Sequence, residues 1–349
     1  MLIEKLRFSL ATVALAFMLG CRESTESPGP DFKNSVVIYC SVDVAFAEPI
    51  LDEFQRRTGI TVHHIFDTEA GKTTGLVNRL SAEKARPRAD VWWSSEIFGT
   101  IQLAERGILA PYKSPVASDI PDAYRDPAGH WTAIGLRGRV IAYDPKRTKE
   151  EDLPKRWCDL TNPKYKGRFQ IADPRFGTTR GHMAVLLSRW GQPAMEGFYE
   201  ALRANDCQLA AGNAKAVLRP TRGLTEFGAT DTDDVIVAQA RGDSVEMIYP
   251  DLDAPGDGPT RKGTLWIPCS VGLVAGGPNT EAGKQLFDYL ISKEVEALLF
   301  ESESRNVPVR PALRKKLRAR ATNEAVVDYA EAAEMLPLSD QLVREKLLE

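Results

Sequence analysis

The sequence predicts an α/β fold of two lobes, with mixed and largely parallel sheets and strands that cross a hinge. Short apolar runs alternate with stretches of helical periodicity, which is the pattern of β-α-β units. The chain has 349 residues with 43% hydrophobic content, enough for about two domains. Two long apolar runs, at residues 131–143 and 263–274, are placed to cross between the lobes.

The composition favours a globular protein. The formal net charge of −3 leaves no basic excess for nucleic acid, and no long block of like charge suggests a binding tail. We therefore expect no nucleic-acid partner.

Residues 1–20 have the organisation of a signal peptide. A short basic segment precedes an apolar run at residues 8–19, which is shorter than the roughly 20 residues of a bilayer span. Residues 18–21 resemble a bacterial lipobox, which would make Cys21 the lipidated start of the mature chain. An ordinary secretory peptide cut near the same place is the alternative, and both imply export. Residues 21–35 are interpreted as a flexible tether.

The first part of the chain alternates strands and helices. We expect strands at residues 36–40, 60–66 and 89–93, and helices at 45–58, 73–84 and 97–106. Polar loops follow these strands, and in an open α/β sheet the ligand crevice lies outside the carboxyl ends of the strands. The loop residues that could share this rim are Ser41, Asp43, Asp67, Glu69, Ser94, Ser95 and Glu96. Taken singly, each is better explained as a helix cap or a solvated loop residue, and it is their joint placement that indicates a site.

The second lobe is predicted to begin after the crossing strand at residues 131–143. We expect strands at residues 169–172 and 208–211, and helices at 183–190, at 194–204, from 213, and up to 241. The segment 228–234 is interpreted as the cap of the last of these helices. After the returning strand at 263–274 we expect helices at 281–290 and 293–301, an extended link at 306–309, and further helices to the end.

Residues 173–182 form a polar junction between a strand and a helix. Such a junction gathers unpaired backbone N–H groups, hydroxyls and positive charge, and so favours an anion. An ordinary loop in which Thr178 or Thr179 caps the helix is the alternative.

The chain resembles the ferric-iron-type substrate-binding proteins of bacterial ABC importers, in extracellular solute-binding protein family 1. The resemblance rests on residues 37–41, 48–51, 58–60, 89–92, 138–140, 231–234 and 267–268. It implies a type II periplasmic-binding fold that captures a small ligand between its lobes and delivers it to an ABC permease with ATPase subunits. The lobe boundaries that we expect are 36–133 plus 264–305 for lobe 1, and 134–263 plus 306–349 for lobe 2.

The metal half of the family site departs from its usual pattern in this sequence. Iron binders of the family use two adjacent tyrosines, and Thr232 and Asp233 occupy the matching positions. Carboxylates are also hard oxygen donors, so the metal site that the resemblance implies could be formed by carboxylates in place of the tyrosines. Its members would be Asp43, Glu96, Asp231 and Asp233. Acidic residues at helix starts are equally stabilised by the helix dipole with no ligand.

The anion half of the family site matches better. The matching and adjoining residues are Arg137, Arg139, Arg175, Thr178, Thr179, Arg180, Gly181 and Asn213. Guanidinium groups recognise phosphate or carboxylate through paired hydrogen bonds. The resemblance implies Fe(III) with a synergistic anion as the ligand. The alternative is metal-free binding of a phosphorylated, phosphonate or other small anionic or zwitterionic solute.

The cysteines allow two disulfides in an exported chain. The lobe assignment would pair Cys40 with Cys269 and Cys158 with Cys207, and lone buried thiols are the alternative.

A hydrolase is the weaker reading of the same polar loops. Ser41 or Ser94 with His182 would be its catalytic residues, but the sequence contains no GxSxG motif. We expect a binding protein without cofactor or catalysis, monomeric, exported to the periplasm or the cell surface, and lipid-anchored to a bacterial membrane.

Overall fold

A ten-stranded mixed sheet organises the protein. The computed structural model describes residues 34–67, 71, 73–258, 260 and 262–349, all of which lie in one of the two units into which the chain divides. The strand order is β2-β1-β3-β10-β5-β8-β6-β7, with β4 paired to β10 and β9 paired to β5. The predicted signal peptide, Cys21 and Glu69 lie outside the described residues.

One half of the sheet is parallel at its edge and antiparallel towards the middle. Its strands are β1 (Ser35–Cys40), β2 (Thr61–Phe66), β3 (Val91–Ser94) and β4 (Leu109–Ala110). β1 pairs in parallel with β2 and β3, as the predicted β-α-β units require.

The other half repeats this organisation. Its strands are β6 (Phe169–Ala172), β7 (Gln208–Ala210), β8 (Phe227–Asp231) and β9 (Glu246–Ile248). β6 pairs in parallel with both β7 and β8.

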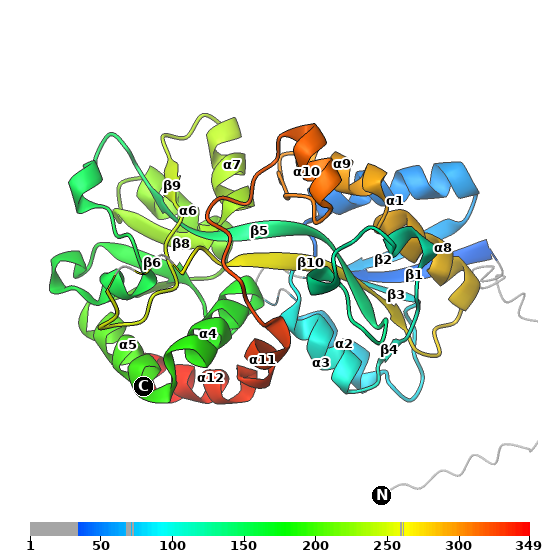
Figure 1. The fold of residues 1–349 in the computed structure, drawn as a ribbon, viewed down its shortest axis with the longest axis horizontal. Coiled ribbons are helices and arrows are strands. Elements are labelled where there is room, and N and C mark those ends of the chain that lie inside the picture. The colour runs from blue at the N-terminus through cyan, green and yellow to red at the C-terminus, as the bar shows by residue number, and fades with distance from the viewer. Residues whose placement is uncertain (1–33, 68–70, 72, 259, 261) are drawn as a thin grey trace, which may run out of the picture. The chain divides into compact units, whose positions relative to one another are not determined.

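Two long antiparallel strands belong to both halves. β5 (Trp131–Tyr143) and β10 (Trp266–Val274) run side by side between two groups of helices (Figure 1). β5 has the bounds predicted from the sequence. The pairing register shifts between Cys269 and Ser270, which marks an irregularity of the β-bulge type in this connection.

Helices cover both halves of the sheet. Those packed around the β1 half are α1 (Val44–Thr58), α2 (Thr74–Ala82), α3 (Phe98–Glu105), α8 (Thr280–Leu290), α9 (Lys293–Glu301) and α10 (Pro311–Leu317). Those around the β6 half are α4 (Gly177–Trp190), α5 (Gln192–Ala204), α6 (Asn213–Thr221), α7 (Thr232–Ala240), α11 (Tyr329–Glu334) and α12 (Leu336–Leu342), which continues into a π-helical turn, Val343–Leu348. Short 3₁₀ turns occur at Pro115–Ala117, Asp122–Tyr124, Glu150–Asp152, Trp157–Thr161 and Pro163–Tyr165.

Local sequence signals explain where several helices end. Gly59 follows α1 with a φ of 71°, a left-handed conformation that glycine adopts without steric cost, and its N–H donates to the carbonyl of Gln55. The sequence predicted this ending, and the structure confirms it.

Each half of the sheet has its own large hydrophobic core. Val36, Phe54 and Leu286 belong to one cluster, and Trp157 and Leu186 belong to the other. Burying a side chain of this size contributes about 1.5–3 kcal/mol.

Helix α3 links the two halves. Although α3 follows β3, its residues Phe98 and Ile101, and Ile97 just before it, pack in the cluster of the β6 half. The contact between Phe98 and α4 is close, because a Cβ atom on Gly181 would lie 2.0 Å from the Phe98 ring. A glycine at this position therefore lets the two halves approach each other.

Two expectations from the sequence need correction. The segment 228–234 was interpreted only as a helix cap; Asp231 is the N-cap residue of α7, but residues 227–231 also form β8, a strand inside the sheet. The strand β8 was not predicted because its polar residues break the apolar alternation that is typical of a strand.

The second correction concerns the cysteines. Cys40, Cys158, Cys207 and Cys269 are all free thiols, so neither expected disulfide is present. The Sγ of Cys40 contacts the carbonyl oxygen of Val42, while that of Cys269 contacts the carbonyl oxygen of Ser95. These thiols use backbone acceptors, as lone buried cysteines often do.

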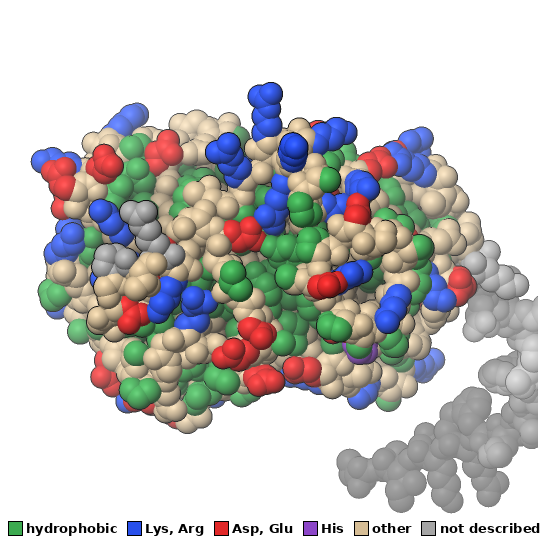
Figure 2. Space-filling view, in the orientation of Figure 1, with side chains coloured by type: hydrophobic (Ala, Val, Ile, Leu, Met, Phe, Trp, Pro, Cys, Tyr) green, Lys and Arg blue, Asp and Glu red, His purple; other side chains and the backbone are tan. Residues whose placement is uncertain are grey.

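On the face shown in Figure 2, acidic and basic side chains are both spread over the surface, with hydrophobic side chains between them. Among the described residues, no helix has the length and apolar character that a membrane span requires.

The packing of β8 against α6 predicts a strong effect of Gly228→Ala. A Cβ atom here would lie 2.1 Å from the carbonyl oxygen of Ala216, so the backbone of α6 must move. We expect a loss of about 1–3 kcal/mol in the free energy of unfolding, measured by urea denaturation.

Gly197→Ala is the matched control, because nothing lies within 4 Å of a Cβ atom at this position in α5. It should stabilise the protein by about 0.5–1 kcal/mol. Equal stabilities of the two variants would contradict the packing of β8 on α6.

Candidate functional site

A small pocket lies where the two halves of the sheet meet. We call it the inner pocket; its volume is about 30 Å³, and its lining includes Ser95, Arg137, Gly177, Thr178, Gly212 and Asn213. These residues come from the loop after β3, from β5, and from the first turns of α4 and α6. As it stands, the pocket has room for about two water molecules.

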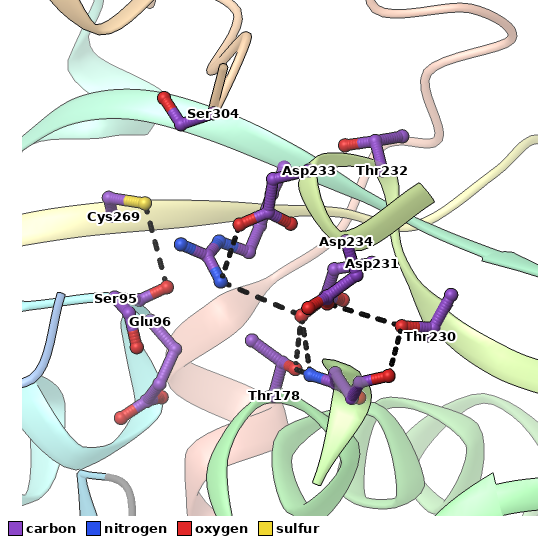
Figure 3. A network of polar contacts seen from close by, with 12 residues as sticks. Ser95, Glu96, Thr178, Thr230, Asp231, Thr232, Asp233, Asp234, Cys269 and Ser304 are labelled. Atoms are coloured by element: carbon purple, nitrogen blue, oxygen red, sulfur yellow. Dashed lines mark hydrogen bonds and ion pairs between the residues drawn. The ribbon is translucent and has the colours of Figure 1, made fainter. Parts of the chain in front are cut away.

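Asp231, at the end of β8, is the centre of a buried polar network beside this pocket (Figure 3). One carboxylate oxygen accepts from Arg139 Nη1 at 2.7 Å. The other accepts from Thr178 Oγ1 at 2.6 Å and from Asn213 Nδ2 at 2.7 Å. Asp231 and Arg139 are both 0% exposed. The carboxylate thus holds together β5, β8, α4 and α6.

In this network, several side chains that were predicted to bind a ligand anion are bonded to Asp231 instead. Thr178, Asn213 and Arg139 were expected to bind a ligand anion, but in the structure they bind the carboxylate of Asp231. Thr179 also belongs to this network, through a hydrogen bond of 3.2 Å from Arg139 Nη2. Asp231 therefore already accepts hydrogen bonds from several of the groups that were expected to donate to the anion.

Arg137 is the arginine that keeps donors for a ligand. Its Nη1 lies 3.2 Å from Asp233 and 3.7 Å from Asp231. Its Nε and Nη2 are buried and have no hydrogen-bond partner among the described residues, although the residue is only 4% exposed. Burial opposes the charge of Arg137, but Asp233 and the other nearby acidic groups raise its pKa well above its usual value. Arg137 therefore stays charged, with two unused donors beside the pocket.

Two helices also begin at the inner pocket. In α4 the backbone N–H of Arg180 donates to the carbonyl of Phe176, and in α6 that of Ala216 donates to the carbonyl of Gly212. Within the described part of the chain, the first-turn amides before Arg180 and Ala216 have no backbone acceptor. Such amides, together with the positive end of the helix dipole, favour an anion.

The loops after β1 and β3 form the opposite side of the site, and Figure 3 shows Ser95 and Glu96 across from Asp231, Asp233 and Asp234, with the Glu96 carboxylate directed away from them. Ser41 Oγ accepts from Thr73 Oγ1 at 3.0 Å and from the N–H of Ser95 at 3.1 Å. Ser94 is 0% exposed and also contacts Ser41. Ser41 and Ser94 thus connect the loops, whereas Ser95 lines the inner pocket.

Glu96 is a buried carboxylate at the start of α3. It accepts hydrogen bonds from the N–H groups of Phe98 and Gly99, so it caps the helix. Burial raises its pKa to about 7, although those N–H groups and the charges of Arg180 and Arg137 act in the opposite direction. Glu96 therefore changes charge near neutral pH.

A second, larger cavity of about 320 Å³ lies next to the inner pocket, and we call it the outer pocket. One side is lined by Glu96, Gln102 and Arg106, and the other by Arg180, Asp340 and Arg344. Arg180 is held by Asp340, which accepts from its Nε at 2.8 Å and from its Nη2 at 2.7 Å.

The structure separates the predicted site residues into groups. The pocket-lining ones are Ser95, Glu96, Arg137, Arg175, Thr178, Arg180, Gly181 and Asn213. Arg139, Thr179, Ser41 and Ser94 lie behind the lining, and Asp43 precedes α1 within electrostatic range of Arg137. Arg175 is paired with Asp173 and is half exposed.

Sequence reasoning missed part of the outer pocket. Arg106, Asp340 and Arg344 lie at the end of α3 and in the C-terminal helices, where no local motif marks them. Only the packing of the C-terminal helices against α4 brings Asp340 to Arg180.

The buried network predicts that Asp231→Asn destabilises the fold. The change keeps the shape of the side chain but leaves Arg139 as a buried, unpaired charge, which we expect to cost on the order of 3 kcal/mol in urea denaturation. Asp206→Asn removes an exposed partner of Lys166 and should change stability by less than about 1 kcal/mol. If both variants lose the same small amount of unfolding free energy, Asp231 does not hold the network together.

The raised pKa of Glu96 predicts a pH-dependent penalty. Because the pKa is about 7 in the folded state and 4.5 for the ordinary group, ionisation costs folding energy as the pH rises from 4.5 through 7. Relative to Glu96→Gln, the native protein should lose stability over this window, by on the order of 3 kcal/mol in total. Urea unfolding of both proteins between pH 4.5 and 8 measures this, and a constant difference would contradict it.

Comparisons with known proteins agree with this fold. The family described as bacterial extracellular solute-binding protein matches residues 100–334. A putative 2-aminoethylphosphonate-binding periplasmic protein of Salmonella typhimurium is 28% identical over 291 residues, 80% of this chain and 81% of that protein.

Two solved structures are also similar in fold. Iron-bound HitA from Pseudomonas aeruginosa has a TM-score of 0.77 and 22% identity over 88% of this chain and 99% of that one. AfuA from Actinobacillus pleuropneumoniae, with exogenous fructose-6-phosphate bound, has a TM-score of 0.75 and 23% identity over 90% of this chain and 99% of that one. The family match confirms the resemblance found in the sequence, and the chain belongs to the bacterial extracellular solute-binding proteins.

Proposed function

We propose that this protein is the exported solute-binding component of an ABC importer, and that its ligand is a small organic phosphate or phosphonate bound without metal. One observation carries the choice of ligand: the buried Arg137 has two unpaired donors at a pocket where two helices begin. The protein would capture the ligand between its halves, close over it and deliver it to a permease.

A phosphate or phosphonate group suits these donors. Its oxygens can accept from a guanidinium through paired hydrogen bonds and from first-turn amides at the same time. Because the pocket now holds only about 30 Å³, a ligand would require the halves to part slightly and close again.

Fe(III) with an anion is the second candidate. It is favoured by Asp231, Asp233 and Asp234, whose carboxylate oxygens lie within 4.8 Å of one another. Against it, Arg139 is 2.7 Å from Asp231 and Arg137 is 3.2 Å from Asp233. A trivalent cation here would meet the repulsion of two buried guanidinium groups.

The relatives support both candidates. The name of the Salmonella protein refers to an aminoethylphosphonate, AfuA is described with fructose-6-phosphate, and HitA is described with iron. The position of Arg137 is what favours the phosphate or phosphonate class for this chain.

The proposal excludes catalysis. Ser41 and Ser94 bond to neighbouring loop groups, and His182 is buried against Trp157, with its ring nitrogens unpaired among the described residues. Burial, followed by the charge of Arg139, lowers the pKa of His182 well below its usual value. No Ser–His pair of a hydrolase forms among these residues.

Attachment through a lipid on Cys21 and a monomeric state are also part of this proposal, and the former rests on the sequence alone. Membrane association that persists in Cys21→Ala would contradict the anchor.

The first test separates the two ligands. Protein purified without chelator should contain no stoichiometric iron by native mass spectrometry and metal analysis, and should be stabilised thermally by methylphosphonate. Stoichiometric iron with a visible charge-transfer band would instead support the second candidate.

The same test includes the variant Arg137→Gln. It should bind methylphosphonate at least about tenfold more weakly in calorimetry, because a charge-assisted hydrogen bond is lost. Ser95→Ala is a second variant that leaves the buried ion pairs intact, and it should also weaken binding. Arg320→Gln, at an exposed arginine outside both pockets, is the control for net charge. Unchanged affinity in both site variants would remove the anion site.

A further inference from the structure

The inner and outer pockets are continuous. Phe176 and Gly177 line both of them. On the opposite side, Ser95 lines the inner pocket, and its neighbour in the chain, Glu96, lines the outer one. A ligand with its phosphate or phosphonate group beside Arg137 would therefore extend its remainder past Gly177 into the outer pocket.

The outer pocket carries an excess of positive charge. Arg106, Arg175, Arg180 and Arg344 line it, against the acidic residues Glu96 and Asp340. Among the described lining residues, four positive and two negative groups leave a formal balance of 4 − 2 = +2.

Of these four arginines, Arg106 and Arg344 keep free donors. Arg175 and Arg180 are instead paired with Asp173 and Asp340. Arg106 uses only Nη1, which donates to Ser81 Oγ at 3.1 Å, and the side chain of Arg344 has no partner among the described residues. The two lie on opposite sides of the pocket, one after α3 and one after α12.

This arrangement discriminates between ligand tails. An ammonium group in the outer pocket would be repelled by Arg106 and Arg344, and a neutral tail would leave their charges without a partner. A carboxylate or a second phosphate would be attracted by both, and either guanidinium could bind it with two donors. The volume of about 320 Å³ leaves space for such a tail.

We propose that the physiological ligand is doubly anionic, with a phosphate or phosphonate group in the inner pocket and a second anionic group between Arg106 and Arg344 in the outer pocket. This inference rests on the proposed metal-free function and names the class of solute within it. It distinguishes this chain from a binder of aminoethylphosphonate, whose tail is cationic.

Three probes with the same head group test the inference by calorimetry. Methylphosphonate has no tail, 2-aminoethylphosphonate has a cationic tail, and 3-phosphonopropionate has an anionic tail. The last should bind about tenfold or more tightly than methylphosphonate, and 2-aminoethylphosphonate should bind more weakly than either. Equal or tighter binding of 2-aminoethylphosphonate would overturn the inference.

Variants locate the second group. Arg106→Gln and Arg344→Gln should each reduce the affinity for 3-phosphonopropionate towards that for methylphosphonate, and by a larger factor than they reduce the affinity for methylphosphonate itself. Both side chains are exposed at the surface, so folding should not depend on them. Arg320→Gln again controls for net charge.

The outcomes separate the two proposals. If no probe binds, the metal-free function fails and this inference fails with it. If methylphosphonate binds and depends on Arg137, but the tail makes no difference, the function stands and this inference fails. If Arg106→Gln and Arg344→Gln slow association of all probes equally in stopped-flow measurements, without changing their relative affinities, the arginines only steer anions and the inference also fails.

Discussion

The ion pair between Arg139 and Asp231 is the interaction on which the rest of the site depends. Both side chains are fully buried, and charges in such a place are tolerated only when they are paired and hydrogen-bonded. The pairing register of β5 and β8 brings the two residues together, since Arg139 lies directly opposite Asp231. The same carboxylate accepts from Thr178 and Asn213, and so fixes the starts of α4 and α6 against the strands.

The internal ion pair also decides which groups face a ligand. Arg139 commits both of its Nη atoms and leaves only Nε without a partner, whereas Arg137, on the same side of β5, leaves both Nε and Nη2 unpaired among the described residues. Gly138 lies between them, and a Cβ atom there would lie 3.0 Å from Thr232 and 3.2 Å from the ring of Trp266. The glycine thus lets β5 approach α7 and β10 closely while both arginines point to the network. Pre-organised donors of this kind bind without a large ordering cost.

The sequence predicts those features that are local. The alternation of apolar runs identifies β1, β5 and β10, and the polar junction at residues 173–182 leads into the start of α4. β8 was missed because three of its five residues, Gly228, Thr230 and Asp231, carry no apolar side chain. The partner of Arg139 lies 92 residues away, and Asp340 lies 160 residues from Arg180. No local sequence pattern predicts a contact between residues so far apart. The sequence therefore identifies the hydrogen-bond donors, but not which of them are bonded to other residues of the protein.

The irregularity between Cys269 and Ser270 has a mechanical consequence. A strand ladder bends most easily where its pairing is interrupted, and this interruption lies on one of the two strands shared by both halves of the sheet. The thiol of Cys269 touches the carbonyl of Ser95, at the wall of the inner pocket. Burial raises the pKa of this thiol to about 11, which keeps it unreactive while the halves are together. A bend at this position would move the sulfur and the pocket wall together, because the Cys269 thiol contacts the Ser95 carbonyl.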